Sequence, residues 1–305
     1  MRRFLLCTTL IAASACTSPE VDELRAALPN ERMLLDDTAL YASQARSAGE
    51  PSDYHLDTMD AIANTNADIG EILAGLDEIT SFRPTWEPSS RTALWGPWLD
   101  DGLYGQLWIR GELDGTYQWA LQIRPEDSGD ADWVNAISGR VEAGADETAS
   151  TGRMQIDFSA IDGAGAGEGE TGRLAIAYDI RTDGAEVSLG IGQFSEDGSI
   201  PADGRVHYDY GVDGGLFDFD VVGELNEEGD GSTLENLQIR SRWDATGAGR
   251  ADARVGGGEL GPLTYYEIEC WNAAGTVVFN ENNADMVRSG DASACIYDDV
   301  SYPGE

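Results

Sequence analysis

The chain has 305 residues and a formal net charge of −37. Such acidity excludes functions that need a basic surface, above all the binding of nucleic acid or of an anionic membrane surface. With 41% hydrophobic and 9% aromatic residues, the composition is that of a folded protein with a solvated acidic surface, and not that of a disordered acidic chain.

The N-terminus has the pattern of an export signal. Met1-Arg2-Arg3 is basic, residues 4–13 are apolar but too few to span a bilayer, and small residues lead to a cysteine in Ala13-Ser14-Ala15-Cys16. This stretch resembles the signal of bacterial lipoproteins, in which the cysteine is acylated and becomes the mature N-terminus. Ala13 stands where that family usually has leucine, so secretion with cleavage near Ala15 stays open as an alternative.

The resemblance implies a location. Residues 1–15 are then a lipoprotein signal peptide that is removed, and Cys16 carries fatty acyl chains, palmitate among them. Thr17, rather than aspartate, follows Cys16, which by resemblance to enterobacterial sorting implies the outer membrane. Because each buried CH₂ contributes about 0.8 kcal/mol, a multiply acylated cysteine is a strong anchor. We therefore expect a protein attached to the outer membrane through its N-terminal lipid.

The cysteines agree with an exported chain. Cys7 leaves with the signal and Cys16 takes the lipid, so that Cys270 and Cys295 remain. Two cysteines in an exported protein most simply form one disulfide. Neither has a second cysteine or a histidine close to it in the sequence, which makes a zinc site the weaker interpretation.

Residues 16–80 are predicted to form the lipid anchor and a helical lead-in. Helices are expected from Ser18 to Leu28, over residues 30–46 and over residues 53–79, with breaks at proline and glycine. The third helix has an apolar stripe at helical spacing, which is typical of a face packed on a core. The stripe consists of Met59, Ile62, Ile69, Ile72, Leu73, Leu76 and Ile79. A lid over the mouth of a β-barrel is the alternative, and residues 81–93 are a predicted linker.

Residues 94–272 are predicted to form one antiparallel β domain. Polar and apolar residues alternate in segments such as 117–124 and 174–181, which places the apolar side chains on one face. Asp-Gly pairs, for example at Asp114 and Asp213, predict two-residue type I′ hairpins. Strands are expected near 103–112, 116–124, 133–142, 152–159, 172–181, 185–193, 205–211, 215–224, 232–243, 248–256 and 263–272. The fold class is therefore mainly β with N-terminal helices (α+β), an up-and-down meander forming a barrel or a strongly curved sheet.

Two further segments complete the predicted fold. Residues 273–305 are expected to form a C-terminal tail tied down by the disulfide, with short strands at 277–279 and 294–297. The alternation of Ala251, Ala253 and Val255 predicts a sheet face of small side chains, as a closely approaching helix or a tight barrel interior requires.

No constellation of residues points to catalysis. Histidine occurs only at His55 and His207, and neither a Gly-x-Ser-x-Gly elbow nor a His-Glu-x-x-His motif is present. His207 lies on the strand face opposite Val206 and Tyr208, so we expect it to face solvent. Acidic residues are too numerous for any one pair to be nominated as the carboxylates of a glycosidase. We predict a non-enzyme with no catalytic residues and no cofactor.

No metal site is predicted either. The weak candidate is Asn226, Glu228 and Asp230, which precede a glycine as in the first half of a calcium loop. Leu237 occupies the twelfth position, where such a loop needs a glutamate, so an acidic hairpin turn is the preferred interpretation. A weaker version of the same pattern consists of Asp127, Asp130 and Asp132.

Tryptophans are numerous in the β region, and most are expected in the core because large aromatic side chains dominate core burial. Those on an exposed face are candidates for stacking on sugars. The tryptophans considered are Trp95, Trp98, Trp108, Trp119, Trp133, Trp243 and Trp271.

These observations favour an acidic envelope lipoprotein with a non-enzymatic structural or binding role, whose protein or small-molecule partner is unknown. One alternative is a carrier that holds a lipid or another hydrophobe in a curved sheet beneath a helical lid. The other is a glycan-directed hydrolase, which requires a cleft with two convergent carboxylates.

Overall fold

The computed structural model describes residues 19–36, 38–44, 51–89, 91–143, 149–195, 199–224 and 233–298. The chain divides into two compact units, which are described separately. Unit 1 comprises Met1–Glu31, Glu71–Ala177 and Gln193–Ser199, and unit 2 comprises Arg32–Gly70, Tyr178–Gly192 and Ile200–Glu305.

The elements follow the predicted order of helices and then strands. The helices and helical turns are α1 (Pro19–Ala26), η1 (Glu31–Met33), α2 (Thr38–Gln44), α3 (Asp53–Ser81), α4 (Phe158–Gly163), η2 (Gly258–Leu260) and η3 (Ala292–Ala294). The strands are β1 (Trp86–Ser89), β2 (Thr92–Asp100), β3 (Leu103–Gly111), β4 (Thr116–Pro125), β5 (Val134–Ala143), β6 (Ser150–Asp157), β7 (Thr171–Arg181), β8 (Gly184–Ser195), β9 (Ala202–Gly211), β10 (Gly214–Gly223), β11 (Glu235–Asp244), β12 (Gly249–Gly257), β13 (Thr264–Trp271), β14 (Val277–Asn282) and β15 (Val287–Gly290).

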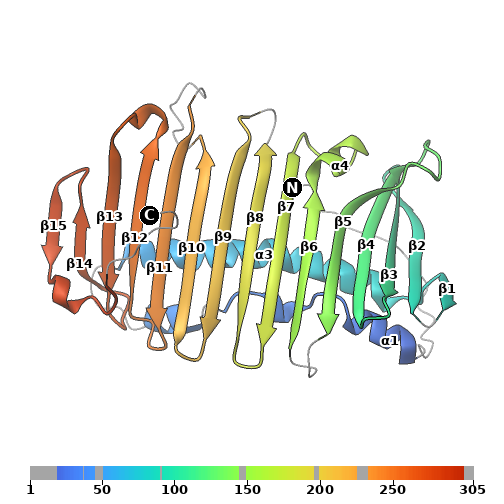
Figure 1. Ribbon diagram of the computed structural model, residues 1–305, viewed down its shortest axis with the longest axis horizontal. Coiled ribbons are helices and arrows are strands. Elements are labelled where there is room, and N and C mark those ends of the chain that lie inside the picture. Colours follow the sequence, from blue (N-terminus) through green and yellow to red (C-terminus); the bar gives the residue numbers. More distant parts are fainter. Residues whose placement is uncertain are drawn as a thin grey trace. The chain divides into compact units, whose positions relative to one another are not determined.

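The predicted antiparallel meander is confirmed, and the barrel, one of the two forms predicted for it, is ruled out because the sheet does not close. Each strand pairs with its neighbour in chain order from β1 to β15, so the order is open at both ends. Figure 1 shows the hairpins following one another along the chain. Both end strands have four residues. Strands this short offer few backbone groups for further pairing, which is how open sheets limit their edges.

The hairpin turns differ from the prediction in their backbone. A type I′ turn needs positive φ at both of its central residues. Among the described Asp-Gly turns, only the one with Asp101 (φ 45°) and Gly102 (φ 80°) meets this requirement. At residues 113–115 only Gly115 has positive φ, and the Asp114 carboxylate accepts hydrogen bonds from the backbone and hydroxyl of Thr116. An aspartate that bonds two residues ahead closes a turn without a left-handed conformation of its own.

Unit 1 packs helical segments on one face of its strands. α1 contacts β2 and β3, and the part of α3 in this unit buries Leu73, Leu76 and Ile79, as its apolar stripe predicts. Trp95 and Trp119 are buried, and the indole of Trp95 donates to the Phe82 carbonyl at 2.9 Å.

Unit 2 packs the first part of α3 on the inner face of its sheet, and α3 crosses the strands (Figure 1). Thr58 Oγ1 lies 2.7 Å from Ser241 Oγ of β11, and the His55 and Trp271 rings are 5.6 Å apart at their centroids. Ala251 and Ala253 are buried, so the predicted small-residue face serves the close approach of a helix.

Four local predictions need correction. The helix expected over residues 30–46 is divided into the helical turn η1 and the helix α2. β1 forms within the predicted linker, where Trp86 pairs with Leu94. The expected strand over 152–159 ends at Asp157, because the Asp157 side chain accepts from Ala160 N and so caps α4. The expected strand at 294–297 is wrong, since Asp291 caps the helical turn η3 in the same way.

Candidate functional site

The outer face of unit 2, opposite α3, is built from rows of charged side chains. Antiparallel register pairs His207 of β9 with Asp218 of β10, Asp218 with Arg240 of β11, and Arg240 with Asp252 of β12. Directly paired residues point to the same side of a sheet, so each acid lies beside a base. A second row consists of Arg205, Asp220, Gln238 and Arg254.

Within each row, hydrogen bonds and ion pairs join the side chains across the strands. Arg240 binds both carboxylate oxygens of Asp218. In the second row, Gln238 Nε2 donates to Asp220 at 3.1 Å and Arg254 Nε donates to Gln238 at 2.5 Å. Bidentate arginine pairs fix the geometry of both partners. The acids of this face are therefore held in place by neighbouring cations and amides.

A shallow groove of about 300 Å³ lies on this face. Its polar lining consists of Ser188, Arg205, His207, Asp218, Asp220, Gln238 and Arg240. We call this surface the charged groove. The sequence predicted the outward direction of His207, which the structure confirms at 28% side-chain exposure. It did not predict the groove, because the members lie on four strands whose register the alternation leaves undetermined.

Two residues of the groove, Ser188 and His207, lie close to Glu186, and the three residue types are those of a catalytic triad. Ser188 Oγ lies 3.1 Å from His207 Nδ1, and Glu186 Oε1 lies 3.9 Å from the same nitrogen. In a triad the nucleophile and the orienting carboxylate contact opposite ring nitrogens, so that one accepts a proton while the other donates. Here both Ser188 and Glu186 lie next to Nδ1 of His207, so this geometry does not activate Ser188.

The groove also contains the carboxylate pair that a hydrolase requires in principle. Asp218 and Asp220 are two residues apart on β10 and face the same side. Arg240 occupies both oxygens of Asp218, while Asp220 accepts from Gln238 and lies 3.8 Å from Arg205. Both carboxylates are therefore engaged by neighbouring side chains, whereas a general acid must present a proton to a leaving group.

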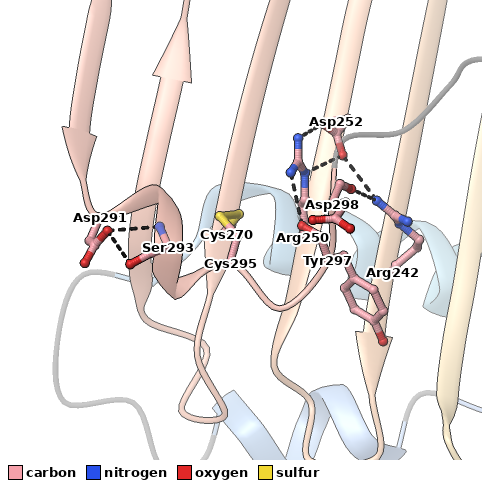
Figure 2. Close-up of a disulfide and its surroundings, with 9 residues drawn as sticks. All are labelled: Arg242, Arg250, Asp252, Cys270, Asp291, Ser293, Cys295, Tyr297 and Asp298. Atoms are coloured by element: carbon pink, nitrogen blue, oxygen red, sulfur yellow. Dashed lines mark hydrogen bonds and ion pairs between the residues drawn. A yellow bond between two sulfur atoms is a disulfide. The ribbon is translucent and has the colours of Figure 1, made fainter.

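At one end of the same face, a disulfide fastens the C-terminal segment over buried charges. Cys270 and Cys295 are joined with their Cα atoms 5.5 Å apart. Residues 295–298, here called the C-terminal strap, lie across Arg242 and Arg250 (Figure 2). Arg250 Nη1 donates to the Tyr297 carbonyl at 3.1 Å, and Arg242 Nη2 donates to the Asp298 carbonyl at 2.8 Å.

An ion pair that is almost fully buried lies beneath the strap. Arg250 binds Asp252 through two hydrogen bonds of 2.8 and 2.5 Å, and both residues are buried. The Arg242 guanidinium lies 5.0 Å from the Tyr297 ring, and burial lowers the pKa of Arg242 although Asp252 opposes that shift. Paired and bonded in this way, the charges can be buried at tolerable cost.

The inner face of unit 2 has a separate polar cluster at the start of α3. Ser52 donates to the buried carboxylate of Glu269, which also accepts from Tyr54 N at 3.1 Å, and His55 N donates to Ser52 Oγ at 3.0 Å. Burial raises the pKa of Glu269 and lowers that of His55. These contacts cap the helix, so we assign the cluster a structural role.

The remaining predicted site residues are either outside the described residues or have contacts that stabilise a loop. Cys16 and the weak calcium candidate Asn226, Glu228 and Asp230 lie outside the described residues. Of the second acidic pattern, Asp130 pairs with Arg124 at 3.3 Å and Asp132 accepts from Gly129 N at 2.7 Å, so both stabilise their loop. Within the described ranges, no group of three or more acidic, histidine or cysteine side chains is arranged to hold a metal ion.

No protein-family model, no curated protein and no solved structure matches this chain. Among the helices in the part of the chain that the structure describes, none combines the length and the apolar character that a membrane span requires.

Proposed function

We propose that this protein is a lipid-anchored bacterial envelope lipoprotein with a non-enzymatic binding role at the outer membrane. The signal-like sequence ending at Cys16 supports the anchor. The disulfide between Cys270 and Cys295 supports export, because such bonds persist in oxidising compartments and are rare in the cytosol.

The binding role rests on one observation: the acids of the charged groove are already engaged by arginines and amides. Asp218 and Asp220 are bonded across strands, so they present a fixed pattern of charge and hydrogen-bonding atoms. Pre-ordered polar groups favour recognition because little entropy is lost on binding. Acid–base catalysis would instead need a carboxylate that faces a leaving group, and both carboxylates are bonded to neighbouring side chains.

Metabolic labelling with an alkyne fatty acid tests the anchor. Wild-type protein should take up the label, Cys16→Ser should not, and Cys7→Ser is the matched control because its cysteine lies in the segment removed with the signal. Labelling of Cys16→Ser would show that the proposed anchor is wrong.

Turnover assays test the binding role. The purified chain should cleave neither chromogenic esters nor chromogenic glycosides, and cleavage that is lost in His207→Ala or Asp218→Asn would make the charged groove an active site. Mass spectrometry under native and denaturing conditions tests the carrier alternative. A mass excess of a few hundred daltons that disappears on denaturation would favour a bound hydrophobe over the role proposed here.

A further inference from the structure

The outer sheet face of unit 1 carries a different chemistry from that of unit 2. Its register places Trp86, Leu94 and Trp108 in one row across β1, β2 and β3, since Trp86 pairs with Leu94 and Leu94 with Trp108. Trp86 is 58% exposed, and Trp108 is half-buried. Neighbouring strands are about 4.8 Å apart, so this row places two indoles roughly 10 Å apart on one surface.

Beside the tryptophans runs a row of side-chain amides. Gln106 Nε2 donates to Gln122 Oε1 and Gln122 Nε2 donates to Asn135 Oδ1, each at 2.8 Å. A carboxamide has two N–H donors and an oxygen with two lone pairs, so a single bond on each side leaves further donors and acceptors. The mutual bonds orient the three amides, and Asn135 is exposed.

A sandwiched arginine closes the other side of the amide row. The Arg124 guanidinium lies 4.3 Å from the centroid of the Tyr104 ring and 5.0 Å from that of the Trp133 ring. It also donates to the carbonyls of Pro125 and Ser128 and to Asp130. These contacts hold the two rings in place. We call the whole surface the aromatic–amide face, consisting of Trp86, Leu94, Trp108, Gln106, Gln122, Asn135, Tyr104, Arg124 and Trp133.

The charges of this region favour a neutral ligand. Arg124 is paired with Asp130 and Arg140 with Asp114, so the nearby cations are neutralised locally. An acidic polymer would also approach a chain whose formal net charge is −37, and like charges repel. A hexose has an apolar C–H face that stacks on aromatic rings and a rim of hydroxyls that need both donors and acceptors.

We propose that the aromatic–amide face binds a neutral, hexose-based polysaccharide. Trp86 and Trp108 stack on two sugar rings that are not adjacent in the polysaccharide, while Gln106, Gln122 and Asn135 bond to hydroxyls along it. The inference goes beyond the binding role proposed above, because it assigns a ligand class to a second surface that is separate from the charged groove, and it does not depend on the lipid anchor.

Affinity electrophoresis tests the proposal with the full chain purified in detergent. Native gels contain hydroxyethyl cellulose, soluble starch or galactomannan as neutral probes, or alginate as an acidic one. We expect at least one neutral polymer to retard the wild-type chain, and Trp108→Ala and Gln122→Ala each to weaken binding about tenfold, as loss of a central contact in an interface does. Trp86→Ala, at an exposed position, is the second aromatic variant if Trp108→Ala unfolds, and Trp108→Tyr should restore part of the binding.

Two matched controls stand on the outer face of unit 2. Tyr266→Ala removes a 39% exposed aromatic ring, and Asn236→Ala removes an exposed amide. Both should bind like the wild type. Absence of retardation by every neutral polymer would overturn the proposal, as would retardation by alginate alone or retardation unchanged in the Trp86, Trp108 and Gln122 variants. Because the fatty-acid label reports only the anchor, failure here and failure of the anchor are separate results.

Discussion

The outer faces of the two units are made by the same strand alternation but hold different side chains. In the charged groove of unit 2, arginine pairs with aspartate across strands. In the aromatic–amide face of unit 1, glutamine pairs with glutamine, and aromatic rings lie beside them. Ion pairs gain from opposite charge and are screened by salt, while amides and aromatic rings present uncharged surface. The same backbone architecture therefore presents two different surface chemistries in one chain.

The largest expected effect on the free energy of unfolding is at Asp252, the buried end of the row that begins at His207. Asp252→Ala leaves Arg250 charged beneath the C-terminal strap, and removing one partner of a buried ion pair costs about 3–5 kcal/mol. Urea unfolding monitored by tryptophan fluorescence measures this. Asp218→Ala, whose partner Arg240 has 24% of its side chain exposed, should cost clearly less. Equal costs for the two variants would contradict the difference in burial.

The disulfide gives the next largest effect. Its cysteines are 25 residues apart, and closing such a loop stabilises by about 3 kcal/mol in the chain-entropy model. The Cys270→Ser, Cys295→Ser double variant should lose this amount in urea unfolding. Reduction of the wild-type protein with dithiothreitol should produce the same loss, and should leave the double variant unchanged.

The buried carboxylate of Glu269, on the inner face of unit 2, should make the free energy of unfolding depend on pH. Because burial raises its pKa, the folded protein binds this proton more tightly than the unfolded chain does. The free energy of unfolding therefore falls as the pH rises from the unfolded pKa through the raised folded pKa.

Glu269→Gln removes that contribution. The wild-type stability minus that of Glu269→Gln should decrease as the pH rises from about 4, near the unfolded pKa. Unfolding curves recorded across pH measure this difference. Glu224→Gln, which changes an exposed glutamate in the same way, is the control. An increase with pH would show that the capping hydrogen bonds from Ser52 and Tyr54 outweigh burial.

The smallest effects compare the two outer faces directly. Arg240→Ala and Gln122→Ala should each cost about 1 kcal/mol or less, as is usual for partly exposed pairs. The cost of Arg240→Ala should shrink between low and high salt, because the ion pair is screened, and that of Gln122→Ala should not. A salt-dependent cost at Gln122 would remove the distinction between the faces.

Much of the fold follows from local patterns. The alternation at residues 117–124 and the apolar stripe from Met59 to Ile79 predict β4 and α3 closely, because both depend on which side chains share a face. Whether the sheet closes could not be predicted, since pairing of the first strand with the last depends on edges far apart in the sequence. The helical turn η3 was also missed, because the cap at Asp291 outweighs the weak strand pattern after it.

The candidate sites were less accessible to prediction. Alternation shows that His207 faces outward, but only register brings Ser188 and Glu186 to it from β8. The tryptophans show the same limit, since Trp119 and Trp108 lie in similar strand patterns and only the first is fully buried.

By itself, the sequence determined most of the strands, the long helix α3, the facing of individual side chains, the pairing of the last two cysteines and the acidity of the surface. Tertiary structure alone decided that the sheet stays open, that the C-terminal strap covers Arg250 and Asp252, and that charged rows form in unit 2 while rings and amides gather in unit 1. The physical reason is that a period of two fixes the side of the sheet on which a residue lies, whereas its neighbours on that side depend on the register of strands that are distant in the sequence.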